Sequence, residues 1–148
     1  MQLPVLALLA MILGGAATAL QGPTNARLAS AVGSPVNAAL VSFFVGTVAL
    51  ALVAVTLQAR PDVQAVKALP AWAGLGGLYG CVVVEAAAWG VPKIGVALTI
   101  TLMVAGQLAL SLILDHFGVM GVPQQPISLT RIAGVLLVIG GVLLVRRG

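Results

Sequence analysis

Charged residues are scarce in this chain of 148 residues, and this scarcity argues against a soluble fold. Only 7% of the residues are charged, whereas a typical soluble domain has about 25%. Seven basic and three acidic side chains give a net charge of +4. No basic run alternates with aromatic residues, which argues against a nucleic-acid partner. The 61% hydrophobic content instead predicts an integral membrane protein.

Residues that hold metals, cofactors or disulfides are nearly absent as well. The single cysteine, Cys81, cannot form an intrachain disulfide. The single histidine, His116, has no second His or Cys at ligand spacing, which argues against a metal site. No Ser/His pair at a plausible depth, no paired-acid site and no cofactor motif is present, so we expect neither an enzyme nor a bound cofactor. The start of the chain also lacks the basic residues of a cleaved signal peptide.

Long apolar runs, by contrast, are abundant. A helix needs about 20 such residues to cross the bilayer core. Five runs have about this length, namely residues 3–27, 35–57, 69–91, 94–117 and 127–145. We expect the third run to end at Gly90 and Pro92. No alternation of period two persists, which argues against a β-barrel. The linkers, such as residues 60–68, are short, so we predict one all-α transmembrane domain over residues 1–148, with its chemistry among the helices.

An acidic residue, Glu85, lies inside the third run, which is otherwise uncharged. A carboxylate in hydrocarbon is costly unless it is paired, protonated or in contact with water, so it indicates function by default. If this run is centred near Cys81, Glu85 lies about 6 Å from the midplane. It could carry a proton or attract a cationic substrate. The alternative is a hydrogen bond to a neighbouring helix, or contact with an aqueous vestibule, without a role in transport.

Two tryptophans bracket the same run. Trp72 and Trp89 are typical of the aromatic belt at the membrane interface. Trp89 follows Glu85 by four residues, which places both side chains on one helix face. Trp89 is therefore also a candidate wall of a cation–π site.

Uncharged polar residues in two other runs are further candidates for binding a substrate or a proton. Gln107, with Ser111 one turn later, could contact a substrate or simply bond across helices, where each contact contributes about 0.6 kcal/mol on average. Gln21 and Asn25 lie on either side of Pro23, which removes a backbone donor. A helix broken there could line a cavity, as discontinuous helices do in transporters. Alternatively, the first helix ends there at the membrane surface.

Four residues are predicted to have structural roles. Asp115 and Arg131 flank the same short loop, so we predict a salt bridge that joins the fourth and fifth helices. Gly76 and Gly80 form a GxxxG pair, which favours close helix contacts and is compatible with a dimer seam.

The basic residues predict a weak preference for orientation. Five spans place the termini on opposite sides, and the two sides receive Arg27, Lys93, Arg146 and Arg147 against Arg60, Lys67 and Arg131. This bias is small for the positive-inside rule, so insertion in both directions is plausible. Two copies inserted in opposite directions could form an antiparallel dimer of ten helices, the inverted-repeat plan of many secondary transporters.

Several segments together are similar to a known family. They are residues 21–28 (QGPTNARL), 33–35 (GSP), 42–47 (SFFVGT), 92–95 (PKIG), 106–111 (GQLALS), 115–118 (DHFG) and 131–134 (RIAG). Over nearly its whole length the chain resembles the YdcZ-like family of the drug/metabolite transporter superfamily. The resemblance implies a five-helix protein of the bacterial inner membrane. It further implies half of a ten-helix transporter, paired with another copy or with a related chain.

The residues and the resemblance together predict a secondary transporter, an exporter or exchanger of a small solute that works by alternating access. Glu85 would couple transport to protons, and Gln107, Gln21 and Asn25 would add polar groups to the cavity. Two alternatives remain, a partner subunit that does not itself transport and a channel. The substrate is not indicated by the sequence.

Overall fold

The structure is a computed structural model that describes residues 4–147, and all regular elements in this range are helical. The long helices are α1 (Val5–Val32), α2 (Pro35–Thr56), α4 (Gly76–Ile94), α5 (Val96–Phe117) and α6 (Leu129–Arg147). Shorter elements are α3 (Val63–Ala68) and the 3-10 turns η1 (Ala71–Leu75) and η2 (Val119–Gly121). Within this range, 5 helical segments are long and apolar enough to cross a membrane, the third of which joins η1 to α4. The predicted all-α class with five apolar spans is confirmed.

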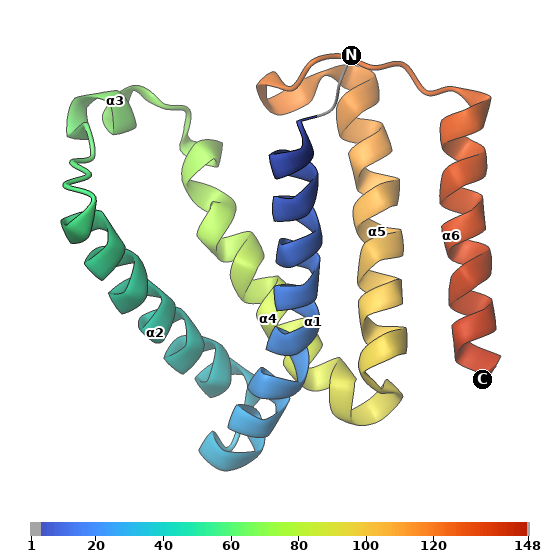
Figure 1. The fold of residues 1–148 in the computed structure, drawn as a ribbon, viewed down its shortest axis with the longest axis horizontal. Helices are drawn as coiled ribbons and strands as arrows, with labels where there is room; N and C mark the ends of the chain where they lie inside the picture. The colour runs from blue at the N-terminus through green and yellow to red at the C-terminus, as the bar shows by residue number, and fades with distance from the viewer. Residues whose placement is uncertain (1–3, 148) are drawn as a thin grey trace. The chain divides into compact units, whose positions relative to one another are not determined.

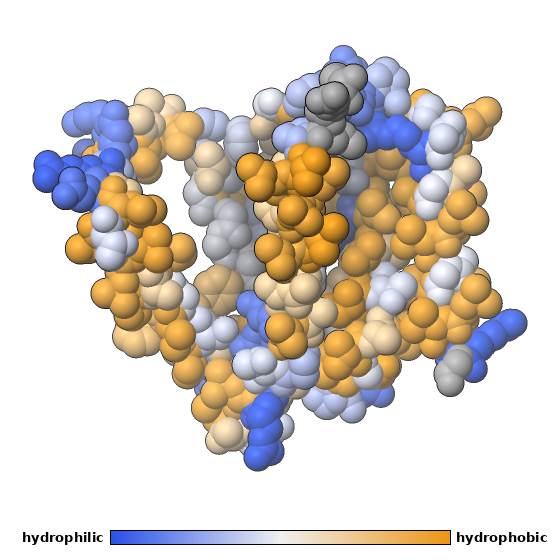
Figure 2. All heavy atoms as spheres, viewed as in Figure 1, coloured by the Kyte–Doolittle hydropathy of each residue, from blue (hydrophilic) through white to orange (hydrophobic). Residues whose placement is uncertain are grey.

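The contacts divide the chain into two compact units, which meet between Lys93 and Ile94. The first unit contains α1, α2 and α4, and the second contains α5 and α6 (Figure 1). In Figure 2, hydrophobic residues cover the sides of α2 and α6, whereas hydrophilic residues gather at the linker that contains α3 and near the C-terminus. This distribution is typical of spans with polar ends at the membrane surface.

The corner between α1 and α2 is held by local hydrogen bonds. Gly33 ends α1 with a φ of 87°, a left-handed conformation that glycine adopts without a steric penalty. The Ser34 side chain accepts from the backbone N–H of Asn37 at 3.1 Å, which caps α2. The Asn37 side-chain amide donates back to the carbonyl oxygen of Val32 at 3.0 Å. Pro35 occupies the first turn of α2, where its missing N–H costs nothing.

The first helix neither breaks nor ends at Pro23, which corrects both interpretations of this segment. α1 continues through Pro23 for 28 residues, to Val32. Proline is tolerated in membrane helices when nearby side chains supply new hydrogen bonds to the backbone. Here the hydroxyl of Thr24, next to Pro23, donates to the carbonyl oxygen of Leu20 at 2.8 Å, which adds a hydrogen bond beside the Ala19 carbonyl that the proline leaves without its usual partner.

The third span also extends further than expected. Gly90 and Pro92 lie inside α4, which ends at Ile94. Gly90 is buried against other parts of the protein, so it serves packing instead of ending the helix. Gly95, directly after the last residue of α4, has a φ of 79°, which is unfavourable for other residues and marks the break before α5. Residues 91–93, at the junction of the third and fourth predicted runs, are therefore helical.

The linker of residues 60–68 contains a short helix that the sequence interpretation missed. The carboxylate of Asp62 accepts from the backbone N–H groups of Gln64 at 2.9 Å and Ala65 at 3.1 Å. These are two of the free donors at the start of α3, so Asp62 is an N-cap. The sequence signal for this helix was Asp62, an N-cap residue type, directly before a segment that contains alanines.

Small side chains form the core of the first unit. The buried residues are Gly22, Asn25 and Ala26 in α1, Ala38 and Ala39 in α2, and Val84, Ala87, Ala88 and Gly90 in α4. At Gly22, an added Cβ would lie only 3.1 Å from Cγ2 of Val91. Close approach through small residues is how membrane helices obtain dispersion contacts without a hydrophobic driving force. This core fixes which face of α4 points inward.

Candidate functional site

Glu85 lies on the face of α4 that points away from the core of the first unit. Val84, Ala87 and Ala88 are buried, whereas Glu85 is exposed. Its carboxylate therefore makes no hydrogen bond to a neighbouring helix among residues 4–147, the alternative role considered for it. Because a carboxylate among acyl chains is costly, this group in a membrane needs water, a counter-charge or a proton.

An open groove runs beside this carboxylate. It is lined by Glu85, Val82, Ala86 and Trp89 of α4 and by Pro35 at the start of α2, and it has a volume of about 400 Å³. All of these residues belong to the first unit, so the groove is formed within it. Glu85 and Trp89 share one wall, as the four-residue spacing predicts. A carboxylate beside an aromatic ring is a combination suited to small cationic groups.

The depth of the groove follows from helix geometry. Glu85 lies nine residues before Ile94, the last residue of α4, which places it about 14 Å from that end of the helix. Half the thickness of a bilayer core is about 15 Å. Glu85 therefore lies near the middle of its span, and Trp89 lies one turn closer to the surface.

The face of Trp89 is already occupied by a cation of the same chain. The ammonium nitrogen of Lys93 lies over the indole ring, 3.6 Å from the ring centroid. Sequence interpretation counted Lys93 only as a topology signal and missed this contact. The available signal was the spacing, since Lys93 follows Trp89 by the same four residues that separate Trp89 from Glu85.

The two amides of α1 have different environments. Gln21 is exposed and lines a groove of about 230 Å³ between α1 and α2, together with Ser42, Phe43 and Thr47. Asn25 is only 1% exposed, and its side-chain nitrogen has no hydrogen-bond partner among residues 4–147. An unpaired buried amide destabilises a protein unless water or another group satisfies it. The two amides therefore do not line one hollow in the first unit.

Gln107 and Ser111 belong to the second unit. Gln107 is exposed on α5. The hydroxyl of Ser111 donates to the carbonyl oxygen of Leu108 at 2.9 Å, so its proton is used within its own helix. The exposed side chain of Gln107 is thus free to contact another chain or a solute, whereas the hydroxyl of Ser111 can act only as a hydrogen-bond acceptor.

The predicted salt bridge between Asp115 and Arg131 is present. The guanidinium of Arg131, at the start of α6, donates to the carboxylate of Asp115, near the end of α5. Both side chains are about 30% exposed, at 30% and 31%. A second guanidinium nitrogen donates to the carbonyl oxygen of Gln125 at 3.0 Å. The pair thus connects two helices and the loop between them.

Further hydrogen bonds complete this connection, which we call the α5–α6 clasp and define as Asp115, His116, Gln124, Gln125, Ile127 and Arg131. The backbone N–H of Gln125 donates to the carbonyl oxygen of Asp115 at 2.7 Å. The side chain of Gln124 donates to the carbonyl oxygen of His116 at 3.0 Å. Nδ1 of His116 accepts from the backbone N–H of Ile127 at 3.2 Å. His116 therefore holds the loop instead of binding a ligand.

The two glycines of the GxxxG pair differ in their surroundings. A Cβ at Gly80 would lie 3.0 Å from Cζ of Phe43. The absence of a side chain at Gly80 therefore lets the Phe43 ring of α2 pack closely against α4. A Cβ at Gly76 would meet nothing within 4 Å. Of these two glycines, Gly80 serves close packing within the first unit, whereas Gly76 leaves its surface free for other contacts.

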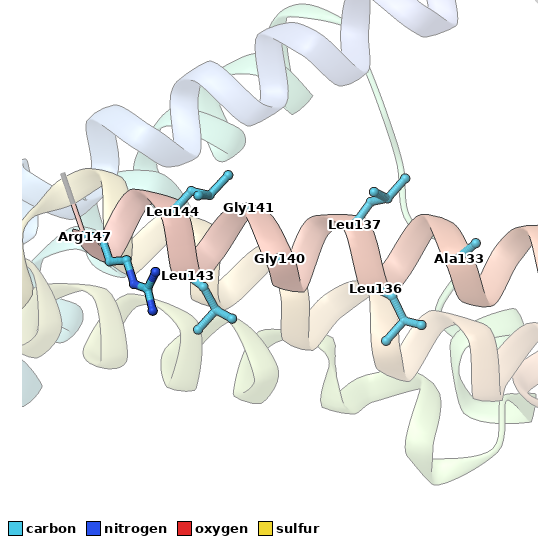
Figure 3. A pocket seen from close by; sticks show the side chains of 8 residues that line it. All are labelled: Ala133, Leu136, Leu137, Gly140, Gly141, Leu143, Leu144 and Arg147. Carbon is cyan, nitrogen blue, oxygen red and sulfur yellow. The ribbon is translucent and has the colours of Figure 1, made fainter.

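A larger hollow lies along α6, and its chemistry does not suit a polar solute. It has a volume of about 790 Å³ and is lined by Ala133, Leu136, Leu137, Gly140, Gly141, Leu143, Leu144 and Arg147. Figure 3 shows leucine side chains projecting from both sides of the helix around the two glycines. Apart from Arg147 at the end, this lining is apolar and fits lipid or another helix. The groove beside Glu85 is therefore the candidate site.

Comparisons with known proteins supply the family. The family described as "Putative inner membrane exporter, YdcZ" matches residues 6–144. No curated protein and no solved structure matches the chain. The family match extends over far more than half of the chain, and its inner-membrane description agrees with five apolar spans. The chain therefore belongs to the YdcZ family, and it is a multi-pass membrane transporter of the inner membrane.

Proposed function

We propose that this chain forms half of a secondary transporter that exports a small solute by alternating access, with Glu85 as the proton-binding group. The observation that carries this proposal is the placement of Glu85. It is exposed near the middle of its span and opens onto a groove lined partly by Trp89. A carboxylate at this depth is stable only beside water, a counter-charge or a proton, which are the requirements of a transport path.

A second chain would provide the opposite wall of this path. The first unit covers one face of α4 and leaves the face with Glu85 open. Two copies inserted in opposite directions would place two such faces together and enclose a cavity at the midplane, as inverted repeats do. The nearly balanced distribution of basic residues supports insertion in both directions. A related five-helix chain in the opposite orientation would serve equally well.

In this arrangement, the carboxylate of Glu85 binds either a proton or the solute at one time. Exchange of one for the other would then couple outward solute movement to inward proton movement. Gln107, with its exposed amide, and Gln21 in its groove would add hydrogen bonds to the solute. Asn25 is buried in the first unit, so a bound water would satisfy its unpaired amide.

The test is proton-linked flux in vesicles that contain the purified protein and a pH-sensitive dye. A panel of small solutes is applied under a proton gradient, and the dye reports proton movement that depends on a solute. We expect the wild-type protein to respond to at least one solute and Glu85→Gln to abolish that response. Flux in Glu85→Gln equal to that of the wild type would remove Glu85 from the mechanism.

The matched control is Asp62→Asn. It removes one carboxylate charge from the chain, as Glu85→Gln does, but at the cap of α3. We expect Asp62→Asn to retain solute-dependent proton flux. A protein that gives no flux with any solute, in spite of correct insertion in both orientations, would favour the role of a partner subunit that does not transport. Flux that does not saturate with solute concentration would indicate a channel.

A further inference from the structure

Three groups of α4 lie in a row along one helix face. Glu85, Trp89 and Lys93 are each separated by four residues, so each lies about one turn above the last. Glu85 and Trp89 line the groove, and the ammonium of Lys93 rests on the Trp89 ring. Glu85 and Lys93 are about 12 Å apart along the helix axis, and they form no salt bridge with each other. The indole ring of Trp89 thus lies between the two charges along the helix and is next to both.

The ammonium of Lys93, 3.6 Å from the centroid of the Trp89 ring, shows that this ring is placed to bind a cation. An ammonium group over an indole face is attracted by the negative charge above the ring plane. Trp89 is 59% exposed, so the indole is open to a solute wherever Lys93 does not cover it. A cation that entered the groove would meet this face and, one turn deeper, the carboxylate of Glu85.

We propose that the groove binds a small methylated organic cation and that Lys93 is a tethered competitor for it. The inference rests on the proposed transport function and deepens it by naming the substrate class. The solute cation would take the position of the Lys93 ammonium on Trp89 while Glu85 supplies the counter-charge. Lys93 would then turn toward the membrane surface, where long basic side chains reach water easily. Lys93 is a specificity-determining residue in this scheme, because only a cation that outcompetes it is bound.

The competition predicts the size of the effect. When a binding site is occupied part of the time by the protein itself, the apparent dissociation constant rises in inverse proportion to the free fraction. Measured cation–π contacts are strong enough to change a binding constant by about 2- to 30-fold. Removal of the Lys93 charge should therefore tighten binding of a solute cation by a factor in this range.

The experiment uses equilibrium binding of radiolabelled choline to the full-length protein in lipid nanodiscs. Choline carries the trimethylammonium group that an aromatic face recognises. The variants are Lys93→Gln, Trp89→Leu and the double variant. We expect Lys93→Gln to bind choline about 2- to 30-fold more tightly than the wild type. In the Trp89→Leu background, Lys93→Gln should bring no such gain, since the shared ring is gone.

Two controls separate the ring contact from a simple change in charge. Lys67→Gln removes a positive charge from α3, outside the groove, and should leave choline binding unchanged. The neutral analogue 3,3-dimethylbutan-1-ol has the shape of choline without its charge and should not displace it from Lys93→Gln. Trp89→Tyr keeps an aromatic face and should retain part of the Lys93 effect, which guards against a folding defect in Trp89→Leu.

Three results would overturn the inference. They are unchanged choline affinity in Lys93→Gln, an equal gain in the Trp89→Leu background, and absence of choline binding to Lys93→Gln at millimolar concentration. Failure of the proposed function has a different signature, namely unaltered solute-dependent proton flux in Glu85→Gln. If that variant abolishes flux but Lys93→Gln leaves choline binding unchanged, the function stands and the cation assignment falls.

Discussion

The α5–α6 clasp allows a quantitative prediction for the second unit. Asp115→Asn keeps the shape of the side chain but removes the charge that faces Arg131. Arg131 then retains its bond to the carbonyl oxygen of Gln125 at 3.0 Å and loses its ionic partner. Because the N–H of Gln125 donates back to the Asp115 carbonyl oxygen at 2.7 Å, weakening the pair should loosen the loop as well.

The expected loss lies between two limits. Solvent-exposed ion pairs contribute about 0.2–1 kcal/mol, whereas hydrogen bonds to charged groups contribute about 1.5–3 kcal/mol. With side-chain exposures of 30% and 31%, the pair is neither fully solvated nor dry. We therefore expect Asp115→Asn to lower the free energy of local opening by about 1–2 kcal/mol. This corresponds to amide exchange that is about 5- to 30-fold faster.

Hydrogen–deuterium exchange at the amides of Gln125 and Ile127 measures this opening directly, because both amides donate within the clasp. Asp62→Asn is the matched control, since its carboxylate accepts from Gln64 and Ala65 at the start of α3. That variant should accelerate exchange only in α3. Unchanged exchange at Gln125 in Asp115→Asn, or equal acceleration there in Asp62→Asn, would refute the clasp.

Three further predictions concern the first unit and the orientation of the chain. Gly22→Leu should destabilise the protein by about 1–3 kcal/mol in a detergent-unfolding titration, because a Cβ there already lies 3.1 Å from Val91, whereas Gly76→Leu should be neutral. Equal losses in the two variants would contradict the packing of α1 on α4. Asn37→Ala should cost about 1 kcal/mol in the same titration, since it removes the bond to the Val32 carbonyl oxygen; no loss would indicate a loose corner. A cysteine added at the C-terminus in a Cys81→Ala background should react with an impermeant reagent from both sides of the membrane, and labelling from one side alone would rule out insertion in both directions.

The spans were predictable from the sequence because membrane helices need long apolar runs, and such runs can be recognised without knowing how the helices pack. The ends of the helices were harder to predict from the sequence. Proline usually stops or kinks a helix, but α1 continues through Pro23 and α4 continues through Pro92. In α1 the Thr24 hydroxyl supplies a donor beside the proline. Whether a proline ends a membrane helix thus depends on its neighbours and packing, which its identity alone does not show.

The candidate site was predictable in part. Spacing placed Glu85 and Trp89 on one wall, and both line the same groove. Spacing also paired Gln21 with Asn25, but burial separates them, because Asn25 faces the small-residue core while Gln21 remains exposed. The contact between Lys93 and Trp89 was missed since Lys93 was interpreted only as a topology signal. Residues that lie four apart share a face, but which face turns inward follows only from the packing of Gly22 and the alanines.

Water access at position 85 tests the central claim most directly. Glu85→Cys in a Cys81→Ala background leaves one thiol, placed in the groove beside Trp89. In membrane vesicles, we predict that a small charged, membrane-impermeant thiol reagent modifies this cysteine, because the groove belongs to a water-filled path. Modification only by a lipid-soluble reagent would show that the position faces acyl chains and would contradict a transport path through Glu85.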